Sequence, residues 1–340
     1  MGARTRTRRW RAVAPVTTVA VLAWVTPGAA FAAAPPRGRP MPIPPVRISG
    51  ITAVSAGGDF ALALRTDGTV VGWGSDQFGQ SSLPRRLTGI IAISAGSDFG
   101  IALRSDGTVV GWGNNEFGKA TPPRWLTGVR AISAGGVWAA AVRWDGTVVA
   151  WGNDEFREVS SANRLRGIIL VAAADNFGLA LRSDGTVLGF GNDEFRKASP
   201  PRWLTGVQDV STGDIFGVAL RWDGTLAAWG GDRFRVVSTA DRVYGIRQVS
   251  GGGGFITALR WDGTVIGWGR DDFGQASPPP WLRGIIEVSS GNDFVVALRS
   301  DGVVVEWGNI GGPAEPVDVG SGMGAAGGAG GAGGGAGSGG

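Results

Sequence analysis

The chain of 340 residues contains neither cysteine nor histidine. Without cysteine there are no disulfides and no thiolate metal sites, and without histidine there are no imidazole ligands and no catalytic arrangement that depends on an imidazole base. The glycine run at residues 251–254 lacks the lysine of a phosphate-binding loop. We therefore expect no metal ion and no cofactor.

Acidic residues are absent from residues 1–32. Five arginines lie within the first eleven residues of this segment. A mostly apolar stretch follows, and the segment ends with Ala30-Phe31-Ala32, an A-x-A cleavage site. We predict a signal peptide over residues 1–32 and a secreted, extracellular protein with no membrane span after cleavage. An uncleaved membrane anchor is the alternative, but two prolines interrupt a segment that is already short for a span.

The high sequence pI of about 10.4 depends largely on this leader. Removing residues 1–32 leaves 27 basic against 28 acidic side chains, because five of the 32 basic residues and none of the 28 acids lie there. A near-neutral mature chain lacks the general electrostatic attraction to nucleic acid. We therefore expect no nucleic-acid partner.

An Asp-Gly pair recurs seven times with a constant spacing of 39 residues. The aspartates are Asp67, Asp106, Asp145, Asp184, Asp223, Asp262 and Asp301. In the first unit, alternating apolar residues predict strands over residues 51–56, 60–65 and 69–73. Asp67-Gly68 is typical of a type I′ hairpin turn, in which both central residues have positive φ.

Seven such units predict an all-β fold, a seven-bladed β-propeller of 39-residue, mainly three-stranded blades. One face of each sheet carries a large residue at the Trp73 position, and small residues recur at the Ala63 and Gly72 positions, which suits face-to-face packing. Glu306 interrupts the small series in the last unit, and we expect it at the ring closure, in contact with solvent.

The propeller is predicted over residues 46–310. A proline-rich linker precedes it at residues 33–45, and a glycine- and alanine-rich tail follows at residues 311–340, which its composition predicts to be disordered. None of the seven units carries an insertion, so no long loop is available to enclose a pocket, and we expect a non-catalytic protein. We also expect a monomer.

Strand order predicts two different ends of the propeller. We define the upper face by the turn after the first strand of each unit and by the exit of the third strand, and the lower face by the Asp-Gly turns. Acids, amides and aromatics on the upper face suit recognition of a protein surface. The candidate partner-binding residues are Asp59, Asp76, Gln77, Phe78, Asp98, Glu116, Phe117, Val137, Trp138, Asp154, Glu155, Asn176, Asp193, Ile215, Asp232, Arg233, Asp271 and Asp293.

Burial is the competing interpretation for the aromatic series that begins with Phe60 and includes Trp138, because by alternation it shares the core side with Leu62. A carbohydrate-binding or cell-wall-binding module, which would use an Asp or Asn and an aromatic from each blade, is the alternative function. On the lower face an arginine ends the second strand of every unit, and tryptophans occur in the turns and linkers. Such a face suits nucleic acid or an anionic glycan, but the uniform recurrence favours a ring of ion pairs between each arginine and the aspartate of its turn.

The repeat resembles that of the regulator of chromosome condensation family over residues 46–309. Its Asp-Gly, Trp-Gly and Phe-Gly-Gln elements are complete at residues 67–80 and 262–275. The short period, the leader and the Phe-Gly-Gln-x-x-x-Pro linker of residues 78–84 are more similar to the β-lactamase inhibitory protein II branch of secreted actinobacterial propellers. The resemblance implies a seven-bladed propeller that binds serine β-lactamases through the upper face.

Two positions depart from these patterns. Phe60 and its equivalents stand where the family repeat has histidine, and the residues just before them, beginning with Asp59, are not aromatic as they are in the inhibitory branch. The resemblance therefore implies the scaffold and not the contact residues. We expect an extracellular protein partner, with a β-lactamase or penicillin-binding protein as the first candidate. The exchange-factor and chromatin-binding roles of the family are a third alternative, which the leader disfavours.

Overall fold

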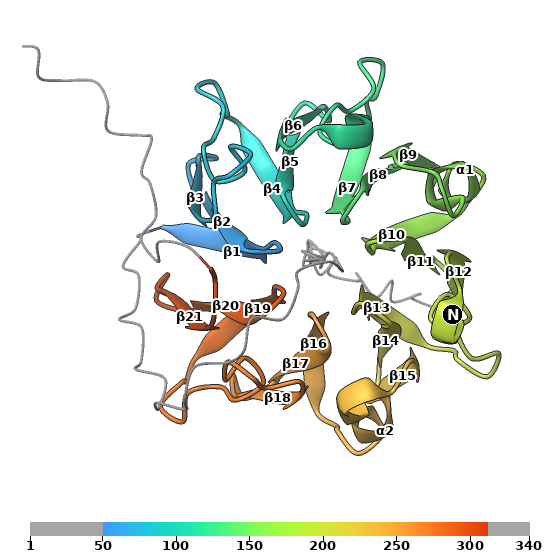
Figure 1. The fold of residues 1–340 in the computed structure, drawn as a ribbon, viewed down its shortest axis with the longest axis vertical. Helices are drawn as coiled ribbons and strands as arrows, with labels where there is room; N and C mark the ends of the chain where they lie inside the picture. The colour runs from blue at the N-terminus through green and yellow to red at the C-terminus, as the bar shows by residue number, and fades with distance from the viewer. Residues whose placement is uncertain (1–49, 312–340) are drawn as a thin grey trace, which may run out of the picture.

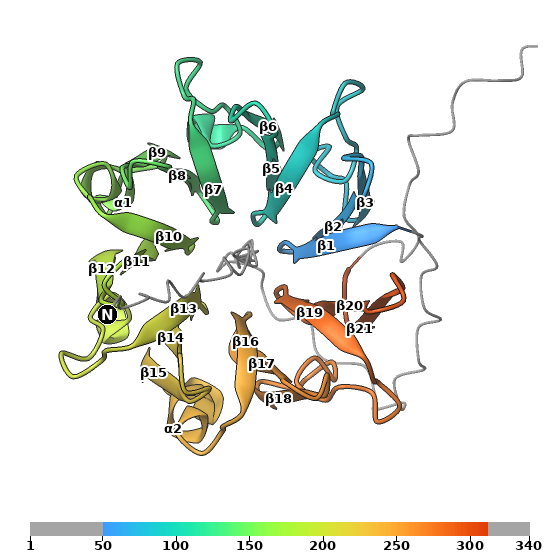
Figure 2. The ribbon, with the colours of Figure 1, turned by 180° about the vertical axis from the view of Figure 1, so that it is seen from behind.

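The computed structural model describes residues 50–311, and these form a ring of seven three-stranded antiparallel sheets (Figure 1). The predicted signal peptide, the linker of residues 33–45 and all but the first residue of the tail lie outside the described residues. Each blade uses one 39-residue unit, with its first strand innermost (Figure 2). The all-β, seven-bladed prediction is confirmed.

The 21 strands fall into seven consecutive sets of three. They are, blade by blade, β1 Ile51–Ala56, β2 Phe60–Arg65 and β3 Val70–Gly74; β4 Ile90–Ala95, β5 Phe99–Arg104 and β6 Val109–Gly113; β7 Val129–Ala134, β8 Trp138–Arg143 and β9 Val148–Gly152; β10 Ile168–Ala173, β11 Phe177–Arg182 and β12 Val187–Gly191; β13 Val207–Thr212, β14 Phe216–Arg221 and β15 Leu226–Gly230; β16 Ile246–Gly251, β17 Phe255–Arg260 and β18 Val265–Gly269; β19 Ile285–Ser290, β20 Phe294–Arg299 and β21 Val304–Gly308. Short helical turns follow some third strands: η1 Glu116–Gly118, α1 Glu158–Ala162, η2 Glu194–Arg196, η3 Arg233–Arg235 and α2 Val236–Ala240.

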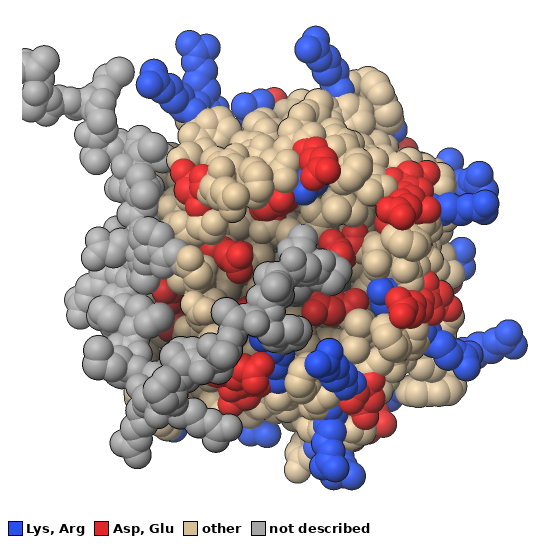
Figure 3. Space-filling model, in the orientation of Figure 1, with Lys and Arg blue, Asp and Glu red and all other residues tan. Residues whose placement is uncertain are grey.

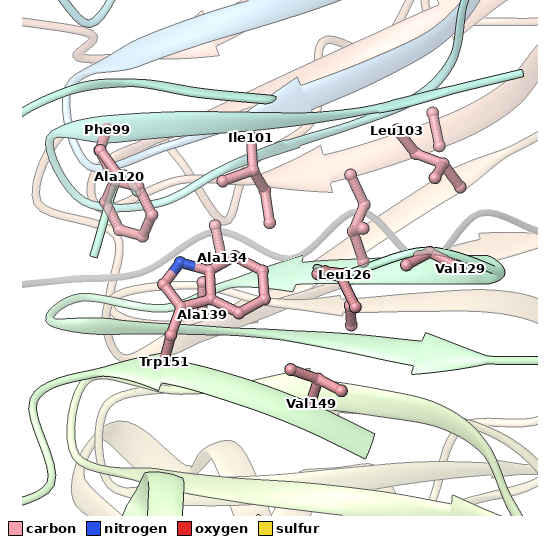
Figure 4. Packing of buried hydrophobic residues seen from close by; sticks show 13 residues of the cluster. Phe99, Ile101, Leu103, Ala120, Leu126, Val129, Ala134, Ala139, Val149 and Trp151 are labelled. Carbon is pink, nitrogen blue, oxygen red and sulfur yellow. The ribbon is translucent and has the colours of Figure 1, made fainter. Parts of the chain in front are cut away.

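The hydrophobic core is divided into seven clusters, one between each pair of neighbouring blades. Between blades 2 and 3, Phe99 and Ile101 of β5 face Ala139 and Trp151 of the next blade (Figure 4). The cluster between blades 7 and 1 likewise packs a phenylalanine, Phe294, against the tryptophan of the next blade, Trp73, so the ring closes by side-chain packing without exchange of a strand.

A serine ladder also links the inner strands. The Ser55 hydroxyl accepts a hydrogen bond of 2.8 Å from the backbone N–H of Ala95, and Ser289 repeats this bond across the closure at 2.9 Å with Ala56. These bonds satisfy backbone donors that a single three-stranded sheet would leave buried without a partner.

The Asp-Gly turns differ from the predicted type I′. The Gly68 N–H donates to the Arg65 carbonyl at 3.0 Å and the Arg65 N–H donates to the Thr69 carbonyl at 2.8 Å, while only the glycine of the Asp67-Gly68 pair has positive φ. This is a type I turn followed by a glycine bulge. The Asp67 carboxylate accepts bonds from the backbone N–H and hydroxyl of Thr69, which stabilise this turn.

The small residues at the Gly72 position have a more local role than sheet-on-sheet packing. A Cβ at Gly72 would lie 2.6 Å from the Ser81 carbonyl oxygen, because the linker of the same blade crosses there. The Gln80 carbonyl in this linker in turn accepts a bond of 2.9 Å from the Trp112 indole of the next blade. The linker is thus held between neighbouring blades, and only a small residue leaves room for it.

Glu306 corrects a second expectation. It lies at the closure, as predicted, but it is buried, and its Oε2 accepts a bond of 2.7 Å from the Trp73 indole. A carboxylate therefore takes the role that a linker carbonyl has for Trp112. Burial raises the pKa of Glu306, whereas the bond from Trp73 lowers it by a smaller amount.

Candidate functional site

The upper face brings together the turn after each first strand and the loop after each third strand. The Ser75 N–H donates to the Asp59 carbonyl at 2.8 Å, so these two segments are neighbours, as strand order predicts. Acidic side chains gather around the centre of this face and most lysine and arginine side chains lie toward its rim (Figure 3). We take this face as the candidate site.

Six phenylalanines, one from each of the first six blades, project from the upper-face loops. They are Phe78, Phe117, Phe156, Phe195, Phe234 and Phe273, and each is between 40 and 54% exposed. The predicted set contained Phe78 and Phe117, and the other four were missed although the same 39-residue spacing identifies them. We call these six residues the phenylalanine ring.

These loops contain non-glycine residues in the left-handed backbone conformation. Within residues 50–311, the non-glycine residues with positive φ are Phe117, Arg157, Phe195, Arg196, Phe234 and Arg235, all in the loops that carry the phenylalanine ring. L-residues disfavour this conformation because the Cβ approaches the following carbonyl. Strain of this kind is concentrated at functional sites.

A second group of charged residues surrounds the centre of the upper face. The Lys119 ammonium pairs with the Asp98 carboxylate at 2.7 Å and donates to the Gly136 carbonyl at 3.2 Å. The Lys197 ammonium donates to the Asn176 side-chain oxygen at 2.9 Å. Each ammonium also lies over a buried ring, Lys119 at 5.4 Å from the centre of Phe99 and Lys197 at 5.2 Å from that of Phe177, which fixes both cations in position.

Asp175 and Asp214 lie among these cations and were not in the predicted set. Burial raises the pKa of Asp175 to about 6, against the opposing charges of Lys197 and Lys119. Burial and the Asp175 charge raise the pKa of Asp214 to about 7, against Arg270 and Lys197. One buried oxygen of each carboxylate has no hydrogen-bond partner within the described residues. We call Asp98, Lys119, Asp175, Lys197, Asp214, Arg270 and Asp293 the charged circuit.

Several predicted residues have structural roles. Trp138 is fully buried and its ring meets Phe190 at 5.7 Å, so the prediction that it faces a partner is wrong; the competing interpretation of burial holds for the whole Phe60 series. Val137 and Ile215 are half-buried and pack against the core. The sequence could not show whether Trp138 is buried or exposed, because Trp138 and the preceding Val137 lie together where a short turn meets a strand.

The Asp76 series fixes the loop conformation. The Asp76 carboxylate accepts bonds from the backbone N–H groups of Ser81 and Ser82 at 2.9 Å each and from the Ser82 hydroxyl at 2.6 Å. The residues with the same role are Asp154, Asp193, Asp232 and Asp271. These carboxylates position the phenylalanine ring, and their exposure leaves them at the edge of any partner contact.

The remaining predicted residues lie on the accessible surface or at the charged centre. Gln77, Glu116, Glu155 and Arg233 are exposed, and so is Asp59. Asp98 and Asp293 belong to the charged circuit, with Asp293 paired to Arg270 at 2.8 Å, and Asn176 holds Lys197.

The predicted uniform ring of ion pairs on the lower face is wrong. In the first six blades the threonine two residues after the turn aspartate donates a hydrogen bond from its hydroxyl to the aspartate carboxylate, as Thr69 does to Asp67. Blade 7 has Val303 at that position, and there Arg299 pairs with Asp301 at 2.7 Å. Arg143 and Arg221 lie over tryptophan rings instead.

Among residues 50–311 no group of three or more acidic side chains is arranged to hold a metal ion, and no helix is long and apolar enough to cross a membrane. The upper face presents exposed aromatics, strained loops and a fixed pattern of charge. Such a face can bind a surface of complementary shape and charge.

Comparison with known proteins agrees with this fold. Residues 51–80 and 90–119 match the family model described as the regulator of chromosome condensation (RCC1) repeat, so the first two blades carry this repeat. No curated protein sequence matches the chain.

Three solved structures illustrate the structural likeness. Prp20p from Saccharomyces cerevisiae, studied with its binding to Gsp1p and histones, is 17% identical, with a TM-score of 0.61 and coverage of 75% of this chain and 82% of that one. Human WBSCR16 is 18% identical, with a TM-score of 0.62 and coverage of 82% and 95%. The CRINKLY WD40 ectodomain of the Arabidopsis thaliana receptor kinase ACR4 is 18% identical, with a TM-score of 0.59 and coverage of 76% and 97%. At these identities the likeness shows an RCC1-like propeller fold and nothing of the ligand.

Proposed function

We propose that the chain is a secreted, non-catalytic β-propeller that binds a protein partner through its upper face. The observation that carries this proposal is the phenylalanine ring: six large apolar side chains stay exposed on one face, on loops that keep three of them and three neighbouring arginines in the left-handed conformation. Exposed phenylalanines and left-handed arginines do not by themselves stabilise the propeller fold. Exposed aromatics grouped on one face are typical of protein interfaces.

Charge adds specificity to this surface. A partner that covers the phenylalanine ring also covers the charged circuit, where Asp175 and Asp214 each keep a buried oxygen without a partner. Because these oxygens are enclosed by the protein, a lysine or arginine on the partner would act on the two carboxylates through its charge and not through a hydrogen bond to the enclosed oxygens. The fixed cations Lys119 and Lys197 would repel a partner of the wrong pattern.

Two lines support a protein as the ligand. The RCC1-like neighbour Prp20p is described as binding the proteins Gsp1p and histones. The sequence resembles the branch of secreted propellers that inhibit β-lactamases, which makes a serine β-lactamase or a penicillin-binding protein the first partner to test. Secretion is proposed from the leader-like residues 1–32.

The glycan alternative cannot use the aromatic that follows Asp59 and its equivalents, because that series is buried, but the exposed phenylalanine ring beside the Asp76 series still offers an acid or amide and an aromatic in six blades. The exchange-factor and chromatin roles remain a third proposal. Detection of the chain with an intact N-terminus in the cytosol would favour them.

The test uses the purified chain as bait for culture supernatant and in inhibition assays against a panel of serine β-lactamases and penicillin-binding proteins. We expect one protein to be retained by the wild-type chain and at least tenfold less by the double variant Phe117→Asp/Phe195→Asp. Both residues are half exposed, so the substitutions leave the core intact.

The matched control is Tyr244→Asp, which introduces the same charge at a 75% exposed aromatic of the lower face. It should retain the partner as wild type does. Loss of the partner in the control, or equal retention in all three proteins, would contradict upper-face binding. Retention without any inhibition would contradict the β-lactamase assignment alone.

A further inference from the structure

The lower face carries a second, independent set of exposed aromatics. Blades 3 and 5 each place one tryptophan in the linker before the first strand and one in the turn after the second strand: Trp125 and Trp144 in blade 3, Trp203 and Trp222 in blade 5. These four side chains are between 62 and 74% exposed. Together they form two pairs with one blade, blade 4, between them.

An arginine is stacked on the linker tryptophan of each pair. The Arg143 guanidinium lies 5.2 Å from the centre of the Trp125 ring, and the Arg221 guanidinium lies 5.0 Å from that of Trp203. Cation–π contacts of this kind fix a guanidinium in place while its edge stays able to donate hydrogen bonds.

In blade 5 these groups line a shallow pocket of about 460 Å³. Its lining residues are Trp203, Thr205, Gly206, Arg221, Trp222 and Asp223. Blade 3 has the same residue types at these positions, namely Trp125, Thr127, Gly128, Arg143, Trp144 and Asp145, but there Arg130 also lies over the Trp144 ring at 5.3 Å, where blade 5 has Gln208.

We propose that blades 3 and 5 each bind one uronic acid unit of an acidic polysaccharide. The electron-rich face of an exposed indole suits the C–H face of a pyranose ring. The guanidinium suits the carboxylate of a uronic acid, which it can bind through two parallel hydrogen bonds. The turn aspartate uses Oδ1 for Thr225, and its other oxygen can accept from sugar hydroxyls.

The charge of this face favours an anionic ligand. The arginines that end the second strands, the aspartates of the turns that follow them and the five residues before the first strands of blades 2 to 7 together supply fifteen arginines and eight aspartates. The arginines are Arg65, Arg85, Arg86, Arg104, Arg124, Arg143, Arg164, Arg166, Arg182, Arg202, Arg221, Arg242, Arg260, Arg283 and Arg299, and the aspartates are the seven of the turns together with Asp241.

The pocket aspartate distinguishes a polysaccharide from nucleic acid. Hydrogen bonds from Thr225 lower the pKa of Asp223, so it is ionised beside Arg221 at neutral pH. A uronic acid and a phosphodiester both meet this negative charge, but the uronic acid also presents hydroxyl donors to the aspartate, which the backbone of DNA lacks. Trp222 and Trp203 alone would accept a base as well as a sugar, so the aspartate decides between the two.

Blades 6 and 7 provide natural half-sites. Blade 6 has the turn tryptophan Trp261, 71% exposed, but Arg242 at the linker position. Blade 7 has the linker tryptophan Trp281 but Ser300 in the turn. Neither half-site combines the two indoles, so substitution there is a matched control.

The test measures binding of the full chain to polygalacturonate, with neutral dextran and a single-stranded oligothymidylate as comparison probes. We expect binding to polygalacturonate, none to dextran, and weaker binding to the oligonucleotide at the same salt concentration. Trp144→Ala/Trp222→Ala should weaken polygalacturonate binding at least tenfold, and Arg143→Met/Arg221→Met at least fivefold. Trp261→Ala should change it less than twofold.

One polymer chain can occupy both sites at once. Trp222→Ala alone should therefore weaken polygalacturonate binding by more than the twofold expected if the two sites bound independently. The upper-face variant Phe117→Asp/Phe195→Asp should bind polygalacturonate as wild type does, which separates this inference from the proposed function. Failure to bind polygalacturonate, tighter binding to oligothymidylate, or an equal loss in Trp261→Ala would each overturn the proposal.

Discussion

The two faces of the propeller are built from the same 39-residue unit but differ in how the unit is used. On the upper face, loops with left-handed arginines and phenylalanines surround a charged circuit in which Lys119 is buried. On the lower face, left-handed positions such as Gly68 and Gly167 are glycines, and the arginines lie at the surface. The upper face therefore accepts local backbone strain in non-glycine residues that the lower face avoids.

This difference shows where the repeat is under a structural constraint and where it is not. The lower-face turn is the same hydrogen-bonded structure in nearly every blade, and what distinguishes blades 3 and 5 is added at its surface. The upper-face residues differ from blade to blade, and Lys119 and Arg270 each contact a residue of the next blade, Gly136 and Asp293. Changes of charge should accordingly have unequal effects on the two faces.

The largest expected effect is a reversal of charge within the charged circuit. Lys119→Glu places a second carboxylate beside Asp98 at a side chain that is only 3% exposed, so we expect a loss of about 3–5 kcal/mol in the free energy of unfolding. Arg299→Glu makes the same change beside Asp301 on the lower face, where the arginine is 37% exposed, and should cost less than about 1 kcal/mol. Urea denaturation of both variants measures the contrast.

Lys119→Met is the control for shape, since it removes the charge and keeps most of the side-chain volume. The free energy of unfolding that Lys119→Met loses should lie between the losses expected for Lys119→Glu and Arg299→Glu. Similar losses for Lys119→Glu and Arg299→Glu would show that the upper-face pair is no better protected from water than the lower-face pair, and the proposed contrast would fail.

The sequence was sufficient for the fold because its signals are repeated. The Asp-Gly period, the alternation in each unit and the Trp-Gly ends define blade number, strand order and the two faces. The exposure of Phe195 and its equivalents could also have been read from the 39-residue spacing, because each follows the end of a third strand.

The sequence was not sufficient for contacts between blades. Trp138 looks like an exposed turn residue until the neighbouring blade is placed over it, and Glu306 looks solvated until Trp73 is brought to it from more than 200 residues away. Asp175 and Asp214 become notable only when Lys197 lies near both. Such contacts depend on ring closure and blade spacing, which a local pattern does not contain.

The second prediction concerns pH and compares the carboxylates of the charged circuit with the turn aspartates, whose pKa values are shifted in opposite directions. Burial raises the pKa of Asp175 to about 6 and that of Asp214 to about 7, from an ordinary value of 3.8. Between about pH 4 and pH 7 the folded chain therefore binds more protons than the unfolded chain, so these two groups make the free energy of unfolding fall as pH rises. Asp175→Asn/Asp214→Asn should raise it by about 1–2 kcal/mol at pH 8 and by much less at pH 4.5.

The turn aspartates provide the comparison. Hydrogen bonds from Thr108 lower the pKa of Asp106, so its contribution to stability is present above pH 3.8 and is lost as pH falls further. Asp106→Asn should consequently lower the free energy of unfolding at neutral pH but not in acid. The slope of the free energy of unfolding against pH between pH 5 and 8 should be the same as in the wild type. Thermal unfolding across this range checks both variants, and a pH-independent gain in the double variant would rule out desolvation as the cause.

The smallest expected effect tests the strain in the loops of the upper face. Arg196 is exposed and has φ of 60°, whereas its equivalent in blade 2 is Gly118 with φ of 74°. Arg196→Gly should therefore stabilise the chain by about 0.5–1 kcal/mol, because glycine adopts this conformation without the Cβ conflict. Gly118→Ala and, on the lower face, Gly167→Ala should each destabilise by a similar amount, since a Cβ would meet no atom within 4 Å at either position and conformation alone determines the cost. If Arg196→Gly instead lowers the midpoint of urea denaturation, the arginine contributes contacts that outweigh its strain, and the upper-face loops are shaped for the stability of the ring and not for a partner.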